Sequence, residues 1–301
     1  MIHHLVLREA DQDFHLEGGF LRSSTRKIAV ASLGSVQCLA DRARWSQAAL
    51  EVLAHQCPTI LARWIKAEKK WHTLAIVPRA RYVQPTALYT LCRLSPQRAT
   101  QLATSLLWTK ILNQQTLLRT FDPHLPEAPR LRENSFQRIL RLEAAYARTF
   151  WARYFAALSD DLFNREKRHP EHPLNIALSY GYGFLYHAIE WQALASGLDS
   201  SIGIVHRLRR SRPNLACDLI EPFRCCVELT VVRHLEEMDG LRHPYAMAGR
   251  FAEMLEQRWW YRGKRYRLRA IIRLTTESFV RALLEKTEFQ PFRLHTRDAL
   301  L

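Results

Sequence analysis

The change of pattern between Pro78 and Pro85 constrains the fold of this chain more than any other feature. Before this short linker, short β-branched runs alternate with turn residues, as is typical of strands. After it, strand patterns almost stop and apolar residues recur at helical spacing. The sequence therefore predicts an α+β protein, with a small β-rich domain at residues 1–78 and a larger all-helical domain at residues 79–301.

Local signals in the first domain predict individual elements. A Gly-Gly pair at residues 18–19 lies between apolar residues and predicts a hairpin turn. Ser46 is a suitable N-cap for a helix that extends to residue 55. Residues 59–77 have the pattern of a second hairpin with a basic tip. None of these residues has the spacing of a catalytic site.

The charge balance points to a polyanionic partner. Forty-four Lys and Arg residues against 29 Asp and Glu give a formal net charge of +15. Nucleic acid is the favoured partner, because phosphate neutralisation with counterion release is the general source of affinity for such surfaces. An acidic membrane surface is the competing interpretation, but no apolar run approaches the ~20 residues that span a bilayer. We therefore expect no membrane partner.

The start of the chain and the cysteines indicate a compartment. The first residues lack the basic, apolar and small-residue layout of a signal peptide. Six cysteines without framework spacing fit a reducing interior. We expect a cytoplasmic protein.

Imidazole and carboxylate groups gather within residues 175–224. His206 lies in a glycine-punctuated segment, and two acids follow it at Asp218 and Glu221. If residues 215–221 are helical, these acids lie three apart on one face. Two carboxylates and one imidazole favour Mg²⁺ or Mn²⁺ over Zn²⁺.

Other interpretations of these groups stay open. A lone histidine is most often a structural residue, and an acid pair three apart is most often a surface feature. A zinc site is a further alternative, but the neighbouring cysteines lack zinc-knuckle spacing and are interpreted as packing residues. These are Cys217, Cys225 and Cys226.

Three motifs follow one another in the same stretch. They are Asn-x-x-Leu-Ser-Tyr-Gly-Tyr at 175–182, Gly-Leu-Asp-x-x-x-Gly-x-x-His at 197–206, and Leu-Ala-x-Asp-Leu-x-Glu-x-Phe-Arg at 215–224. Together they resemble the CRISPR-associated Cas-one family, the adaptation integrases that insert new spacers into a repeat array. Lys-Ile-x-Asn-Gln at 110–114 and the acid Glu143, with Trp151 eight residues later, extend the resemblance.

The resemblance implies a site. Its metal ligands fall on Glu143, His206 and Glu221, which would bind Mg²⁺ or Mn²⁺. Asp218 is the fourth expected catalytic residue, as a supporting acid or alternate ligand.

A second set of residues is expected to contact DNA. It consists of Arg207, Arg209, Arg210, Arg212, Arg224, Tyr180 and Tyr182. Arg224 has the alternative of orienting a carboxylate, and the two tyrosines have that of core packing. The polar segment 160–173 is either a solvated loop or a further DNA contact. The basic, aromatic segment 261–269 is either a DNA contact or a turn followed by a basic helix start.

The implied activity is metal-dependent DNA endonuclease and integrase action, in which a 3′-hydroxyl attacks a phosphodiester during spacer acquisition. The implied partners are double-stranded DNA, as incoming spacer DNA and repeat-leader DNA, a second copy of the chain, which would pair through the β-rich domain, and a Cas-two protein. Alternatives are a transposon-type integrase outside CRISPR, a branched-DNA nuclease, and an inactive DNA-binding scaffold.

Overall fold

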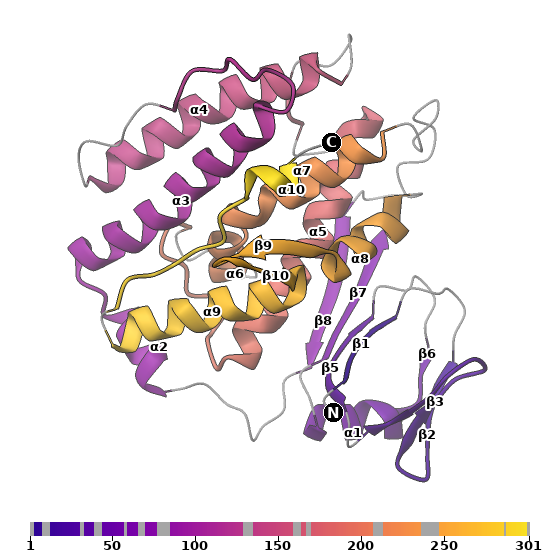
Figure 1. Ribbon diagram of the computed structural model, residues 1–301. Helices are drawn as coiled ribbons and strands as arrows, with labels where there is room; N and C mark the ends of the chain where they lie inside the picture. Colours follow the sequence, from indigo (N-terminus) through magenta and orange to yellow (C-terminus); the bar gives the residue numbers. More distant parts are fainter. Residues whose placement is uncertain are drawn as a thin grey trace. The chain divides into compact units, whose positions relative to one another are not determined.

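The computed structural model describes most of the chain and divides it into two compact units. The described residues are 3–7, 13–30, 33–38, 44–56, 59–65, 70–76, 85–128, 135–158, 164–166, 170–206, 213–235, 247–285 and 287–299. One unit comprises Met1–Gln84 and Trp191–Leu198, and the other comprises Pro85–Glu190 and Asp199–Leu301. Strands dominate the N-terminal part and helices dominate the rest, which confirms the predicted α+β class (Figure 1).

The first unit contains a mixed sheet with the strand order β1-β5-β7-β8. Its strands are β1 (His3–Leu7), β5 (Leu33–Cys38), β7 (Thr59–Ile65) and β8 (Lys70–Ile76). β5 pairs in parallel with β1 and β7, whereas β7 and β8 pair in antiparallel fashion. The second predicted hairpin is thereby confirmed, while residues 66–69 of its basic tip lie outside the described residues.

A second sheet of the same unit has the order β4-β3-β2-β6. Its strands are β2 (Asp13–Glu17), β3 (Phe20–Arg22), β4 (Lys27–Ala29) and β6 (Arg44–Trp45). Gly18 and Gly19 connect β2 to β3 with φ values of 56° and 79°. Two consecutive residues in this left-handed region make the tight turn that glycine tolerates best, as the Gly-Gly pair predicts.

Helix α1 (Gln47–Gln56) contributes Ala49 and Leu53 to the apolar core of this unit. The Ser46 hydroxyl accepts a hydrogen bond from the Ala49 amide at 3.2 Å, which confirms the predicted N-cap. The Phe14 and Trp45 rings stack at 4.6 Å. The buried core residues are Phe14, Leu21, Val30, Val36, Cys38, Ala49 and Leu53.

Helices make up most of the second unit. They are α2 (Pro85–Cys92), α3 (Pro96–Leu118), α4 (Phe136–Ala156), α5 (Pro173–Ala195, as far as Glu190), α6 (Asn214–Leu219), the 3₁₀ turn η3 (Glu221–Phe223), α7 (Arg224–Arg233), α8 (Ala248–Glu256), α9 (Leu268–Leu284) and α10 (Thr296–Ala299). The long helices α3 and α4 pack side by side (Figure 1). None of the described helices combines the length and the apolar character needed to cross a bilayer.

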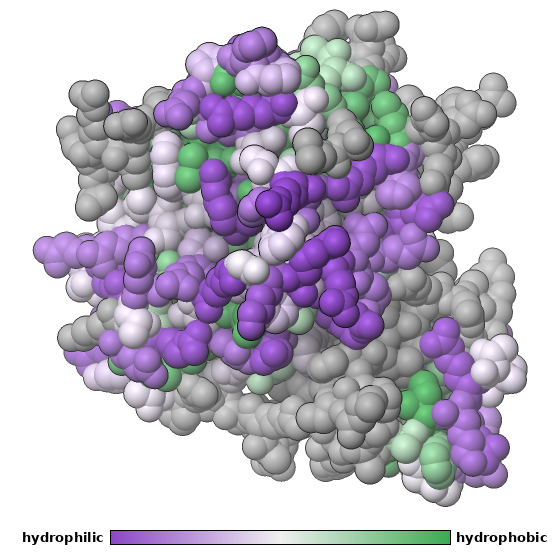
Figure 2. Space-filling model, viewed as in Figure 1, coloured by the Kyte–Doolittle hydropathy of each residue, from purple (hydrophilic) through white to green (hydrophobic). Residues whose placement is uncertain are grey.

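A two-stranded hairpin interrupts the helices of this unit. β9 (Arg258–Tyr261) pairs with β10 (Lys264–Arg267) in antiparallel fashion. Arg262 and Gly263 make the turn with φ values of 50° and 77°. The basic, aromatic segment therefore folds as a hairpin before α9 begins, which is a departure from an all-helical domain. Its exposed cations are Arg258, Arg262, Lys264, Arg265 and Arg267. Hydrophilic residues cover much of the surface at this part of the view in Figure 2.

The start of α3 follows from its sequence. Pro96 occupies the first turn, where its missing N–H costs nothing. The Ser95 hydroxyl accepts a hydrogen bond from the Arg98 amide at 3.2 Å. This is the capped start that the Ser-Pro pair predicts.

Asn113 fastens α3 to two distant segments of the same unit. Its Nδ2 donates to the carbonyl oxygens of Pro222 at 2.7 Å and Phe292 at 2.9 Å. Its Oδ1 accepts from the Leu294 amide at 2.9 Å. The Phe223 and Phe292 rings stack beside this junction with centroids 5.2 Å apart. A buried asparagine thus satisfies backbone groups at η3 and near the C-terminal end of the described chain.

Replacement of Asn113 tests this junction. Asn113→Ala leaves two carbonyls and one amide without their partner in a buried setting, so we expect the free energy of unfolding to fall by about 2–4 kcal/mol. Urea denaturation measures the loss. Gln101→Ala is the matched control, because Gln101 lies exposed on the same helix. Equal stabilities for the two variants would contradict the role assigned to Asn113.

Candidate active site

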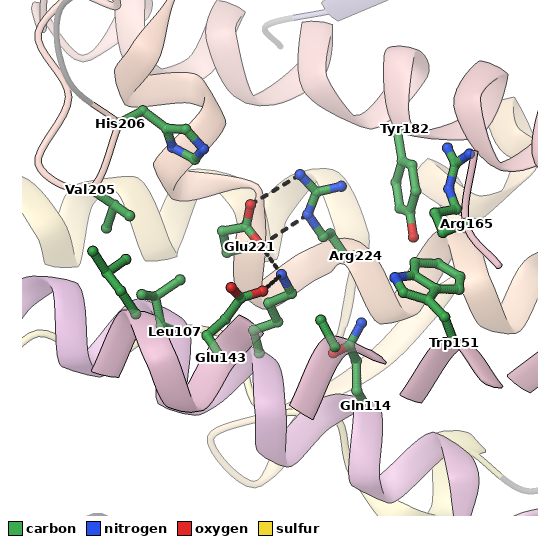
Figure 3. A pocket seen from close by; sticks show the side chains of 13 residues that line it. Leu107, Gln114, Glu143, Trp151, Arg165, Tyr182, Val205, His206, Glu221 and Arg224 are labelled. Carbon is green, nitrogen blue, oxygen red and sulfur yellow. Dashed lines mark hydrogen bonds and ion pairs between the residues drawn. The ribbon is translucent and has the colours of Figure 1, made fainter. Parts of the chain in front are cut away.

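A cavity of about 370 Å³ opens in the helical unit. Side chains from α3, α4, α5, η3 and α7 line it, together with residues from the segments that precede α5 and α6. Its charged and imidazole lining residues are Lys110, Glu143, Arg165, His206, Glu221 and Arg224. Figure 3 shows His206 at one end of this pocket, Trp151 and Arg165 at the other, and Glu143, Glu221 and Arg224 between them.

Lys110 joins the two carboxylates of this cavity. Its Nζ lies 2.5 Å from Glu143 Oε1 and 2.7 Å from Glu221 Oε2. The three side chains are 11%, 21% and 5% exposed, so most of the ion cluster is removed from water. Glu143 and Glu221 therefore face each other across one ammonium group (Figure 3).

Arg224 fixes Glu221 from the other side. Its Nε and Nη2 donate to the two carboxylate oxygens of Glu221, both at 3.0 Å. Burial would raise the pKa of Glu221, but the Arg224 guanidinium and the Lys110 ammonium outweigh it and hold that pKa well below its usual range. The pKa of Lys110 is raised, because attraction to Glu221 and Glu143 exceeds the opposing effects of burial and of Arg224. Both groups are therefore charged at neutral pH.

The helix predicted over residues 215–221 ends earlier than expected, which corrects the placement of its two acids. α6 stops at Leu219, and Glu221 opens the 3₁₀ turn η3. Pro222 explains the change, because proline lacks an N–H and disfavours the α conformation in the residue before it. Asp218 and Glu221 consequently bind different partners instead of forming one acidic face.

Asp218 holds a loop rather than facing Lys110. Its Oδ2 accepts from the amides of Ile204 at 2.5 Å and Val205 at 2.9 Å. Its Oδ1 accepts from the His206 amide at 3.0 Å and contacts His206 Nδ1 at 2.5 Å. The side chain is fully buried. These four contacts occupy both oxygens, so Asp218 fixes the backbone of residues 204–206 and contacts the His206 ring.

The contact with Asp218 also orients the imidazole of His206. A carboxylate accepts hydrogen bonds, so Nδ1 carries the proton and the lone pair lies on Nε2. The His206 side chain is 31% exposed and lines the cavity. An imidazole held in this way is the common arrangement of a metal-binding histidine, whose second nitrogen donates to a carboxylate.

Gly203 allows the loop to close around Asp218. A Cβ atom at this position would lie 2.5 Å from the His206 carbonyl oxygen and 2.8 Å from Asn214 Cβ. It would also lie 3.0 Å from Asp218 Oδ2. The glycine of the Gly-x-x-His motif is therefore required by close approach of the backbone.

The other end of the cavity is cationic and aromatic. Arg165 lies 5.8 Å from the Trp151 ring centroid and 5.7 Å from that of Tyr182. Its guanidinium donates to Asn175 Oδ1 at 3.0 Å and to Ser179 Oγ at 2.8 Å. Burial lowers its pKa. Among the described residues no carboxylate forms an ion pair with this guanidinium.

Glu228 lies buried behind this end. Its Oε1 accepts from the Tyr182 hydroxyl at 2.7 Å and from Gln114 Nε2 at 3.1 Å. Burial raises its pKa, although the two hydrogen bonds oppose the shift. The Tyr182 hydroxyl thus donates its hydrogen bond to a buried carboxyl group.

Glu143, His206 and Glu221, the three expected metal ligands, line the same cavity. Arg224 orients a carboxylate, which was one of its two predicted roles. Tyr180 is 7% exposed and lies against Phe184 and Phe251, a packing position. The predicted DNA-contacting residues Arg207, Arg209, Arg210 and Arg212 lie outside the described residues.

Two lining residues have roles that sequence reasoning missed. Lys110 was recognised only as part of the Lys-Ile-x-Asn-Gln motif, and Arg165 only as one cation of a polar connection. Their proximity to the acids depends on the packing of separate helices. The one sequence signal for Lys110 was its motif, which places it three residues before Asn113 on the same helix.

The two carboxylates and the imidazole are chemically suited to a hard divalent ion, although the Lys110 ammonium lies between the two carboxylates. No group of three or more His, Cys, Asp or Glu side chains in the described part of the chain stands ready to hold a metal ion. Between Glu143 and Glu221 the space is taken by the Lys110 ammonium, itself a cation. Two carboxylates and an imidazole nitrogen are donors that Mg²⁺ and Mn²⁺ accept.

The chain is similar in sequence to several known proteins. The family model described as "CRISPR associated protein Cas1" matches residues 4–239. A segment of 68 residues is 48% identical to the CRISPR-associated endonuclease Cas1 1 of Pyrobaculum aerophilum and covers 22% of each chain. The chain spans 22% to 52% of the lengths of the first curated relatives that it matches.

Solved structures extend the likeness to the whole fold. A casposase bound to its integration product is 18% identical, with a TM-score of 0.76 and coverage of 98% of this chain and 93% of that chain. A Cas6-RT-Cas1–Cas2 complex is 19% identical, with a TM-score of 0.73 and coverage of 97% and 36%. At these identities the likeness shows the fold alone.

A glycine pair tests the loop around Asp218. We expect Gly203→Ala to lower the free energy of unfolding by about 1–3 kcal/mol, because the new methyl group meets backbone and buried side-chain atoms. Gly249→Ala is the control, since nothing lies within 4 Å of a Cβ there. Denaturation curves and the His206 imidazole resonances report the two effects. Unchanged resonances in a destabilised Gly203→Ala protein would contradict the link between this glycine and His206.

The depressed pKa of Glu221 predicts a pH dependence. Its carboxylate contributes stability that is fully present above the ordinary glutamate pKa of about 4.3. This contribution is lost as the pH falls from there toward the lower pKa of the folded state. The free-energy difference between wild type and Glu221→Gln should therefore be constant from about pH 7 to pH 5 and change below about pH 4.3. A difference that stays constant into that acidic range would count against the ion cluster.

Proposed function

The chain belongs to the CRISPR-associated Cas1 family, and from this premise we propose that it is a metal-dependent DNA integrase and endonuclease that inserts new spacers into a CRISPR array. In the proposed reaction the 3′-hydroxyl of an incoming strand attacks a phosphodiester of repeat-leader DNA. A new phosphorus–oxygen bond forms while the bond to the 3′-oxygen of the target strand breaks. The attacking hydroxyl loses a proton, and the departing oxygen gains one.

The observation that carries this proposal is the shared cavity of Glu143, His206 and Glu221. These residues come from α4, the loop before α6, and η3, so the fold must assemble them. Glu143 and Glu221 would hold Mg²⁺ or Mn²⁺ together with His206 Nε2. Such an ion, when bound, would polarise the phosphodiester and stabilise charge on the departing oxygen.

The remaining residues of the site position these donors. Asp218 fixes the tautomer and direction of His206, and Arg224 fixes both oxygens of Glu221. Arg165 adds an anchored positive charge beside Trp151 that suits a DNA phosphate. If water replaces the 3′-hydroxyl as nucleophile, the same residues support hydrolysis.

Double-stranded DNA is the proposed substrate, as incoming spacer DNA and as repeat-leader DNA. The formal net charge of +15 favours phosphate binding. The casposase of similar fold is described as bound to an integration product. The segment with Arg207, Arg209, Arg210 and Arg212 directly follows His206, and its role in DNA binding is part of this proposal.

Two protein partners are also proposed. A Cas2 protein accompanies Cas1 in a complex of similar fold, so we propose a Cas2 partner for this chain. A second copy of the chain, paired through the β-rich unit, would place two such cavities in one assembly. Two cavities held at a fixed separation would set the length of the inserted DNA.

A transposon-type integrase is the second candidate function. The casposase structure covers 98% of this chain with a TM-score of 0.76, so the fold serves that reaction as well. The two functions differ in the target DNA. Integration next to a CRISPR leader supports the first, and insertion of DNA that carries terminal inverted repeats supports the second.

A joining assay tests the proposed function. The purified chain, with a Cas2 protein from the same genome, is incubated with a short 3′-hydroxyl duplex, a repeat-bearing plasmid and Mn²⁺. We expect wild type to form half-site products. Glu143→Gln and His206→Ala should lose them by about a hundredfold or more, because even outer-shell partners of a metal cost 10–100-fold. DNA binding should be largely unchanged.

Glu277→Gln is the matched control, since Glu277 forms an exposed ion pair with Arg273 on α9. Joining by Glu143→Gln and His206→Ala at the control's rate would support the scaffold alternative. Joining that zinc restores after chelation, but Mn²⁺ and Mg²⁺ do not, would refute the choice of ion.

A further inference from the structure

The ion cluster of the cavity is already electrically balanced. Glu143 and Glu221 supply two negative charges, and Lys110 and Arg224 supply two positive ones. A divalent ion placed among these groups would add two positive charges at short range to side chains that are mostly buried. Like charges in a partly desolvated site repel one another strongly.

The two native cations differ in how firmly they are held. Arg224 donates two parallel hydrogen bonds to Glu221 and lies 4.8 Å from the Tyr182 ring centroid. Lys110 makes single contacts through one nitrogen at the end of a flexible stem. Lys110 is therefore the less firmly held of the two cations.

We propose that Lys110 is an internal counter-cation, which competes with the divalent ion for Glu143 and Glu221 and makes metal binding depend on DNA. The proposal rests on the proposed function. The displaced ammonium remains on α3 beside the cavity, where a non-bridging phosphate oxygen is a suitable new partner. DNA phosphates also neutralise the excess positive charge that the ion brings.

Reciprocal coupling follows from this arrangement. If bound DNA raises the affinity for the ion, then the bound ion raises the affinity for DNA by the same factor. Without DNA, Lys110 protects the acids from the ion and holds α3, α4 and η3 together. Lys110 acts through the two carboxylates and is therefore a positioning residue.

Metal affinity measured without turnover tests the proposal. Electron paramagnetic resonance counts free Mn²⁺ during titration of the purified chain, with and without a duplex that ends in 3′-deoxynucleotides. We expect Lys110→Met to bind Mn²⁺ about tenfold or more tightly than wild type in the absence of DNA. The duplex should increase the Mn²⁺ affinity of wild type more than that of the variant.

Two further variants make the result interpretable. Arg273→Met removes a surface cation from its pair with Glu277 and should leave Mn²⁺ affinity unchanged. Lys110→Gln keeps a polar side chain without the charge and should reproduce Lys110→Met if the latter folds poorly. Circular dichroism verifies that each variant is folded.

The outcomes separate this proposal from the function on which it rests. Mn²⁺ binding that is weaker or equal in both folded Lys110 variants overturns the counter-cation. If tight binding in Lys110→Met persists after Glu143→Gln and His206→Ala are added, the ion binds elsewhere and the proposed metal site itself is wrong. Loss of binding in those combined variants supports both proposals.

Discussion

Four alternating charges hold the walls of the cavity together. Lys110 links α3 to Glu143 on α4 and to Glu221 on η3, and Arg224 completes the row. Buried ion pairs contribute little net stability, because desolvation offsets most of their attraction, whereas removal of one member leaves an uncompensated charge. A purely structural junction between these helices would be better served by apolar side chains. The desolvation cost of charged groups between these helices therefore favours a chemical function for them over a purely structural one.

Short-range signals predicted the parts of the fold that depend on neighbouring residues. The Gly18–Gly19 turn and the caps at Ser46 and Ser95 each require only a few adjacent atoms, and all three are confirmed. The sheet order was beyond such reasoning, since β1 pairs with β5 and β2 pairs with β6 across intervening chain. The hairpin at β9 and β10 was read as a turn before a helix, because its basic residues carry no clear strand alternation.

The identities of the expected ligands came from motifs, whereas their geometry did not. Helical periodicity placed Asp218 and Glu221 on one face, but α6 ends at Leu219 and Glu221 opens the 3₁₀ turn that contains Pro222. Asp218 therefore accepts hydrogen bonds from loop amides, whereas Glu221 forms ion pairs with Lys110 and Arg224. The ion pairs of Lys110 could not be predicted from the sequence, because their acidic partners lie on α4 and η3. The structure explains two motif residues to which no chemistry is assigned. Asn113 forms hydrogen bonds with backbone groups far along the chain. Gly203 lies where the backbone passes too close to other atoms for a Cβ atom.

The two ends of the cavity carry different groups, and both suit a polyanionic ligand. At one end lie carboxylates and an imidazole, donors that suit a hard cation; Arg224 and Lys110 keep Glu221 ionised, and Arg224 orients it. At the other end Arg165 keeps its charge near two aromatic rings without a carboxylate partner among the described residues. Three cations thus face two carboxylates before any divalent ion enters, and that ion increases the excess. A ligand that brings several negative charges is the one that such a cavity accommodates, which favours a phosphodiester chain over a neutral substrate.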